Sequence, residues 1–169
     1  MKRKKLRLLL TQACNRKCPG CCNNDWDLNS LEKETDYSQY DLIMLTGGEP
    51  MLFPDLIEKV VKEIRETSTA KIYVYTAKVD NVTEVIRVLN LVDGLTVTLH
   101  EQKDVEHFKR LYYVLEVLEC FHKKSLRLNI FKEVYFPLNV LPLWDVKDNI
   151  EWIRHCPLPT GEVFKRYAY

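Results

Sequence analysis

Residues 41–76 read DLIMLTGGEPMLFPDLIEKVVKEIRETSTAKIYVYT, and this stretch holds one complete strand–helix–strand unit. The apolar run Asp41–Thr46 predicts one strand, and the β-branched and aromatic run Lys71–Thr76 predicts another. Between them, from Pro54 to about Glu66, apolar residues recur at helical spacing on one side. Two strands joined by a one-sided helix indicate a parallel pair with a helical crossover.

The same alternation extends in both directions along the chain. Further strands are predicted at Leu6–Thr11, Leu95–Leu99 and Leu126–Phe131. Further helices are predicted after the capping residue Asn81, over Val105–His122 and over Asp148–His155. A closed eight-unit barrel needs about 250 residues, whereas this chain has 169. We therefore expect an α/β fold with an open, partial barrel of five or six β/α units, and a site at the carboxyl ends of its parallel strands.

Composition indicates one folded domain over residues 1–169, with 46% hydrophobic and 29% charged residues. The near balance of 25 basic and 24 acidic residues argues against a general polyanion binder, so no nucleic-acid partner is expected. The basic run Lys2–Lys5 is interpreted as a solvated leader, and the alternative is a contact with RNA or a phosphate. No apolar run has the length of a membrane span, and a cytoplasmic location is expected.

Within this domain, residues 1–135 are expected to form the β/α core, and residues 136–169 a C-terminal segment. Four prolines exclude one long helix there. Five aromatic residues are too many for a free tail: Trp144, Trp152, Phe164, Tyr167 and Tyr169. The segment is predicted to cover the open side of the barrel and to line part of a substrate site. The alternative is that these rings only cap exposed apolar edges.

Directly after the first predicted strand come Cys14, Cys18 and Cys21, in the spacing C-x-x-x-C-x-x-C. Clustered cysteines favour a metal site over a disulfide framework. Three thiolates can hold an iron–sulfur cluster of four irons and leave one iron open. The alternative is a zinc site completed by Cys22 or by the distant Cys156.

The other cysteines receive separate predictions. Cys22 is interpreted as a bystander that points away from the cluster ligands. Cys120 is expected in the core of the third helix. Cys156 is placed where the chain could return over the open side of the barrel.

A second motif, Thr46-Gly47-Gly48-Glu49-Pro50, ends the second predicted strand. The two glycines allow the backbone to approach a ligand closely, and Glu49 adds a carboxylate suited to a cationic amine. Alone, the motif would be an ordinary turn between a strand and a helix. Because both motifs follow neighbouring strands, we expect them to face one site.

The two motifs together resemble the radical S-adenosylmethionine (SAM) superfamily. In that family the three cysteines bind a [4Fe–4S] cluster, SAM chelates the open iron, and the Gly-Gly-Glu-Pro segment binds the SAM amino group. The similarity extends to residues 92–100, where Thr98 takes the place of a family Ser or Thr, and to residues 127–130, where Asn129 would face the cofactor. The metal ligands implied are Cys14, Cys18 and Cys21. The cofactor-binding residues expected on this basis and from strand-end positions are Thr46, Gly47, Gly48, Glu49, Pro50, Thr76, Thr98 and Asn129.

One departure is informative. Many members carry an aromatic residue just before the third cysteine, whereas this chain has Gly20. The Cys-Pro-Gly-Cys form, followed by Asn23 and Trp26, is similar to the small activases of anaerobic ribonucleotide reductase. Glu49 stands where those activases often have Asp.

The resemblance implies an enzyme in which a reduced cluster cleaves SAM to a 5′-deoxyadenosyl radical, which takes hydrogen from an unidentified substrate. The subclass (oxidoreductase, lyase or isomerase) stays open. Two versions remain: an activating enzyme acting on a glycyl-radical protein, and a modifier of a small molecule or nucleotide. A one-electron donor such as flavodoxin or ferredoxin is the expected partner, with a protein or peptide substrate as a further one.

Tyr75, His100 and Glu101 are additional candidate site residues near the strand ends. For His100, a substrate contact and an ordinary hydrogen-bonded histidine are equal alternatives. The competing reading from another class is a zinc-stabilised binding module.

Overall fold

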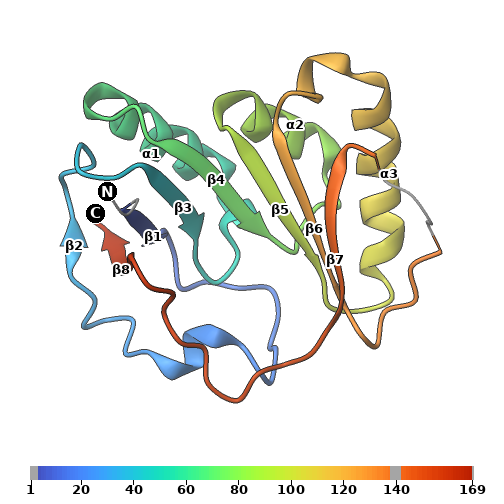
Figure 1. Ribbon diagram of the computed structural model, residues 1–169, viewed down its shortest axis with the longest axis horizontal. Helices are drawn as coiled ribbons and strands as arrows, with labels where there is room; N and C mark the ends of the chain where they lie inside the picture. The colour runs from blue at the N-terminus through green and yellow to red at the C-terminus, as the bar shows by residue number, and fades with distance from the viewer. Residues whose placement is uncertain (1–3, 138–141, 169) are drawn as a thin grey trace.

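The computed structural model describes residues 4–137 and 142–168. Within these ranges, one open sheet holds eight parallel strands in the order β2-β8-β1-β3-β4-β5-β6-β7 (Figure 1). The strands are β1 (Lys5–Leu9), β2 (Lys33–Glu34), β3 (Leu42–Thr46), β4 (Lys71–Thr76), β5 (Gly94–Leu99), β6 (Ser125–Phe131), β7 (Trp144–Ile150) and β8 (Glu162–Tyr167). The α/β class and the open parallel sheet are confirmed, and the arrangement is compatible with a partial barrel.

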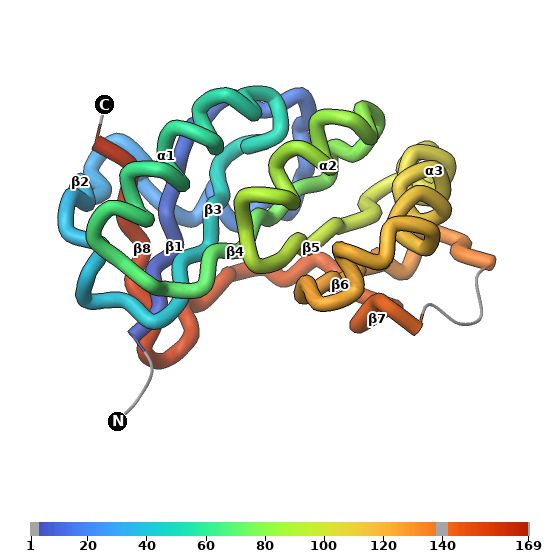
Figure 2. The backbone as a smooth tube through the Cα atoms, turned by 90° about the horizontal axis from the view of Figure 1, so that it is seen from above, coloured from blue at the N-terminus to red at the C-terminus, as the bar shows by residue number. Residues whose placement is uncertain are grey.

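Three α-helices cover one face of this sheet (Figure 2). They are α1 (Pro54–Thr67), α2 (Val82–Leu91) and α3 (Asp104–Val117), and short 3-10 turns occur at η1 (Cys22–Asp25), η2 (Pro50–Leu52) and η3 (Glu119–Phe121). The predicted cap is confirmed, since the Asn81 side chain accepts a hydrogen bond from the Glu84 N–H at 3.2 Å. None of the helices among the described residues is both long and apolar enough to cross a membrane.

The two faces of the sheet differ in exposure because successive side chains of a strand point to opposite sides. One row of register partners crosses five strands and is at most 3% exposed: Leu8, Leu45, Val74, Leu95 and Leu126. With the buried stripe of α1 it forms the core, where each such side chain contributes about 1.5–3 kcal/mol by leaving water. The alternate row of Thr98, Asn129 and Lys147 is half-buried to exposed and leaves a polar open face.

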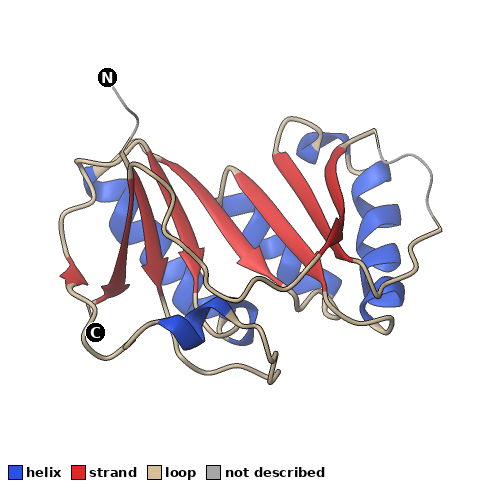
Figure 3. Ribbon diagram, turned by 60° about the horizontal axis from the view of Figure 1, so that its bottom comes forward, coloured by secondary structure: helices blue, strands red, loops and turns tan. Residues whose placement is uncertain are grey.

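The C-terminal segment extends the sheet at two places. β7 pairs with β6, and β8 inserts between β1 and β2. Residues 151–161, here called the strap, connect the two strands and cross the sheet from the carboxyl end of β7 to the amino end of β8, which pairs with the start of β1 (Figures 1 and 3). Tyr169, one of the aromatic residues singled out above, lies outside the described residues, as do Lys2 and Arg3.

Two expectations for this part of the chain are wrong. The helix over Asp148–His155 does not form, because residues up to Ile150 pair with β6 and the strap that follows is irregular. Cys120 is exposed and not in the core: α3 ends at Val117, so Cys120 falls in η3, where Phe121 takes the buried place.

Candidate functional site

A cavity of about 1000 Å³ opens at the carboxyl ends of the strands. Its lining includes all three predicted metal ligands, Cys14, Cys18 and Cys21. It also includes seven of the eight predicted cofactor-binding residues: Thr46, Gly47, Gly48, Glu49, Thr76, Thr98 and Asn129. Pro50 does not line it and is buried in η2. Ten of these eleven predicted residues therefore line one cavity; of the additional candidates, Tyr75 and His100 line it and Glu101 does not.

The turn after β3 is joined to the start of the cysteine loop by the backbone. Pairing continues past the ends of β1 and β3, since the Leu10 N–H donates to the Thr46 carbonyl at 2.9 Å. The Gly48 N–H then donates to Thr11 at 2.8 Å, and the Glu49 N–H to Ala13 at 2.9 Å. Cys14 is the next residue, so this ladder fixes where the cysteine loop begins.

This close approach requires glycine. A Cβ atom on Gly48 would lie 2.2 Å from the Ala13 carbonyl oxygen, and one on Gly47 would lie 2.6 Å from that of Thr11. Both neighbours are backbone atoms, which cannot move aside as a side chain can. Asn23 adds a further tie, because its side-chain amide donates to the Gly47 carbonyl at 2.8 Å.

Glu49 is 2% exposed, and its carboxylate already has three donors from the chain. Oε1 accepts from the Met51 N–H at 2.9 Å and from the Thr76 hydroxyl at 2.6 Å, and Oε2 accepts from the Ala77 N–H at 2.9 Å. Glu49 and Thr76 thus join the ends of β3 and β4. We expected the Glu49 carboxylate to bind a cationic amine. In the structure this carboxylate already accepts three hydrogen bonds from the chain and holds the turn in place.

The cysteine loop carries three free thiols that differ in exposure. Cys14 is exposed, whereas Cys18 and Cys21 are half-buried. Burial raises the pKa of the Cys18 thiol, and the neighbouring thiols of Cys21 and Cys14 raise it further. Among the residues described, no three Cys, His, Asp or Glu side chains converge closely enough to hold a metal ion.

A buried ion pair anchors the loop from the other side. The Arg16 guanidinium donates from Nη1 to Asp104 Oδ2 at 2.9 Å and from Nη2 to Oδ1 at 2.6 Å, and Nη2 also donates to the Ala77 carbonyl at 3.1 Å. Asp104 is 1% exposed and accepts from the backbone of His100 and Glu101 as well. Burial alone would raise the pKa of Asp104, but these hydrogen bonds and the Arg16 charge lower it.

The opposite wall of the cavity comes from β7 and the strap. Trp152 stacks on His100 with ring centroids 5.2 Å apart and contacts Phe131 at 4.2 Å. Trp152 also covers Gly20, where a Cβ atom would lie 2.7 Å from its ring. The strap thus brings an aromatic ring against the position where many members of the resembled family carry one within the cysteine motif. Burial, followed by the Arg16 charge, lowers the pKa of His100.

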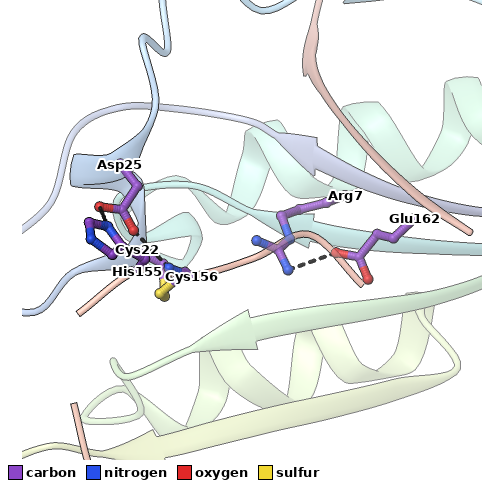
Figure 4. The surroundings of a disulfide bond; sticks show 6 residues. All are labelled: Arg7, Cys22, Asp25, His155, Cys156 and Glu162. Atoms are coloured by element: carbon purple, nitrogen blue, oxygen red, sulfur yellow. Dashed lines mark hydrogen bonds and ion pairs between the residues drawn. A yellow bond between two sulfur atoms is a disulfide. The ribbon is translucent and has the colours of Figure 1, made fainter. Parts of the chain in front are cut away.

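A disulfide joins this wall to the cysteine loop. Cys22 is bonded to Cys156, across 134 residues of sequence (Figure 4). Beside it, the Cys156 N–H donates to Asp25 Oδ2 at 2.8 Å, and His155 Nδ1 lies 3.9 Å from Asp25 Oδ1. The prediction that Cys22 is a bystander is therefore wrong, whereas Cys156 does return over the carboxyl ends of the strands.

Sequence reasoning missed Arg16, Asp104 and Trp152. Arg16 and Asp104 lie 88 residues apart, and no local pattern pairs them. Of the three, only Arg16 could have been selected from the sequence, because it is a cation between Cys14 and Cys18 and would need an acidic partner. Trp152 was noted as an aromatic residue of the C-terminal segment, but its contact with Gly20 depends on the path of the strap.

Comparison with known proteins adds no relative: no protein-family model matches the chain, and no curated protein sequence matches it significantly.

Proposed function

We propose that this chain is a radical SAM enzyme whose substrate is not yet identified. The observation that carries the proposal is that Cys14, Cys18 and Cys21 share one cavity with the Gly47–Glu49 turn at the carboxyl ends of parallel strands. Two motifs that are far apart in sequence are also bonded to one another through Thr11 and Ala13.

The residues fit a [4Fe–4S] cluster in number and chemistry. Three free thiols lie within one short loop, and thiolates are the usual ligands of such clusters. Three ligands leave one iron for SAM, and the pair would supply one-electron cleavage of the SAM sulfonium when bound. The thiols do not converge as they stand, so binding must draw them together; the loop between Cys14 and Cys21 has no helix or strand to oppose this.

The chain's own residues would then bind, orient and shield. The Gly47–Gly48 turn lines the cavity and would contact the SAM amino-acid group there, while Glu49 keeps that turn in place. Thr98 and Asn129 present adjacent polar groups further along the cavity, with the Asn129 amide 3.4 Å from the Thr98 hydroxyl. The Trp152 wall would exclude water from a reactive intermediate.

The alternative hypothesis, a structural zinc site, needs a fourth protein ligand, because such sites are usually four-coordinate. The two candidates for the fourth ligand were Cys22 and Cys156. Because these two are bonded to each other, neither thiolate is available while the disulfide is closed. This favours the three-thiolate cluster.

Anaerobic reconstitution with iron and sulfide tests the proposal. We expect a brown protein with ~4 irons and ~4 sulfides per chain and absorption near about 400 nm. Cys18→Ala should lose the cluster, and Cys120→Ala, which alters an exposed thiol in η3, should keep it. A colourless wild-type protein holding one tightly bound zinc would contradict the proposal.

Partners and location remain part of the proposal. The enzyme needs a one-electron donor such as flavodoxin or ferredoxin, and a cytoplasmic location suits a cluster of this kind. Co-purification with a large glycyl-radical protein, with a glycine-centred signal in electron paramagnetic resonance, would favour the activase version over a small-molecule or nucleotide modifier.

A further inference from the structure

The strap is attached to the cysteine loop at three points. Trp152 rests on Gly20. The Cys156 N–H donates to the Asp25 carboxylate, and Cys156 is bonded to Cys22 (Figure 4). The contacts of Trp152 with Gly20 and of the Cys156 N–H with Asp25 are non-covalent. The disulfide is the covalent contact, and it joins the strap to the residue that follows Cys21 directly.

The disulfide also sets how many thiolates face the cavity. Cys22 lines the same cavity as Cys14, Cys18 and Cys21, so four cysteines of one loop line one space. While the disulfide is closed, three of these four are free. When it is open, the loop offers four thiols within nine residues of sequence.

We propose that the Cys22–Cys156 disulfide is a redox-controlled clasp that fixes the number of thiolates in the cavity. Closed, it leaves three thiolates, a set that suits a cluster with one open iron. Open, it adds Cys22 as a fourth, a set that suits a soft divalent cation such as Zn²⁺ in tetrahedral coordination. This inference rests on the proposed function in one respect only, namely the identity of the group that the three thiolates bind.

The opening step is thiol–disulfide exchange with a dithiol. One thiolate of the dithiol attacks the Cys22 sulfur, because Cys22 lines the cavity whereas Cys156 is 9% exposed. The Cys22–Cys156 bond breaks and Cys156 leaves as a thiolate that takes up a proton. The second thiol of the dithiol then resolves the mixed disulfide, which releases Cys22 and forms the dithiol's own disulfide. The chain gains two electrons and two protons, and the dithiol loses them.

The first test counts thiols in the metal-free protein. After exposure to air, denaturation and labelling with a maleimide polymer should give four labels per chain, and prior reduction should give six. Mass spectrometry of a digest should find the Cys22 and Cys156 peptides linked. Six labels without reduction, or a link that involves Cys14, Cys18 or Cys21 instead, would overturn the proposal.

The second test titrates the metal-free protein with zinc alone against a chromophoric chelator. The wild-type protein is measured in its air-oxidised form and after reduction by a dithiol that is then removed anaerobically. Reduction should tighten zinc binding about tenfold or more, because a fourth thiolate becomes available. Cys22→Ser should abolish this gain, Cys156→Ser should bind tightly before and after reduction, and Cys120→Ser should behave as wild type. Equal zinc affinity of the two wild-type forms would overturn the proposal without recourse to any variant.

The two proposals can fail separately. A protein that passes the zinc test but assembles no iron–sulfur cluster with the clasp closed refutes the proposed function and leaves the clasp. A protein that assembles the cluster but shows no effect of reduction on zinc affinity refutes the clasp and leaves the proposed function.

Discussion

The cavity has two walls that are built in different ways. The cysteine wall, residues 11–21 with residues 46–49, is held by backbone hydrogen bonds, by two glycines that touch carbonyl oxygens, and by a buried ion pair. The strap wall, residues 147–153, is held by ring contacts and, through Cys156, by one disulfide.

The anchor points of the two walls therefore differ in how far they can move. On the cysteine wall, Gly47 and Gly48 lie against main-chain atoms and Arg16 pairs with a buried carboxylate, so these anchor points cannot shift, whereas the loop between them that carries the thiols can. On the strap wall, Trp152 is 37% exposed and belongs to an irregular segment. We expect the cysteine wall to position the cofactor and the strap wall to accommodate the substrate.

The largest effect is expected from Arg16→Met, which leaves Asp104 buried without its cation. Removing one partner of a buried pair costs about 3–5 kcal/mol, and Arg16 and Asp104 side chains are 11% and 2% exposed. Urea denaturation should show this loss, and Arg16→Lys should recover part of it. A loss below about 1 kcal/mol would mean that the pair does not anchor the loop.

The same pair predicts a pH dependence. Because the folded-state pKa of Asp104 is lowered, its contribution to stability is present above its ordinary pKa of 3.8. That contribution is lost as the pH falls from there through the folded-state value. The difference in unfolding free energy between wild type and Asp104→Asn should therefore shrink on acidification below about pH 4, whereas a constant difference would contradict the assignment.

Matched glycine substitutions compare the walls directly. Gly48→Ala drives a Cβ atom to 2.2 Å from a backbone oxygen, so we expect a loss of about 1–3 kcal/mol and of cluster assembly. Gly20→Ala meets the Trp152 side chain at 2.7 Å, and the strap can shift, so the loss should stay below about 1 kcal/mol with the cluster retained. Denaturation curves and iron content decide, and equal losses at the two positions would remove the distinction between the walls.

The smallest effect concerns His100, which follows β5 and stacks on Trp152 of the strap wall. Burial lowers its pKa below the ordinary 6.5, so the folded protein binds its proton less readily than the unfolded chain does. Stability should therefore fall slightly as the pH drops through 6.5, and His100→Gln should weaken that dependence. Nuclear magnetic resonance titration of the ring should give a midpoint below 6.5, and a midpoint above it would contradict the burial argument.

The two walls also differ in how far sequence could predict them. The strands β1 and β3 to β6 and the helices between them follow from local apolar periodicity, and these five predicted strands start within one residue of the observed ones, whereas β2 was not predicted. The Gly47–Glu49 turn could be located because a glycine pair directly after a strand indicates that the backbone approaches another group closely. Local sequence patterns predict these units because each helix and strand buries its own apolar residues against its neighbours.

The strap wall depends on pairing between distant segments. β7 has a polar sequence that sits as a strand only because the edge of β6 offers hydrogen bonds, and the predicted helix over Asp148–His155 failed for that reason. The Cys22–Cys156 bond and the Arg16–Asp104 pair join residues 134 and 88 apart in sequence. No periodicity encodes such partners, so they require the fold.

We propose that the cysteine wall holds a cluster that cleaves SAM, and product formation tests this. Wild-type protein, reconstituted anaerobically and reduced with dithionite, should convert SAM to 5′-deoxyadenosine and methionine in equal amounts. Cys18→Ala should form neither, and Cys120→Ala should match wild type. A wild-type protein that carries its full iron and sulfide content, is reduced, and still leaves SAM intact would refute the proposed radical SAM activity.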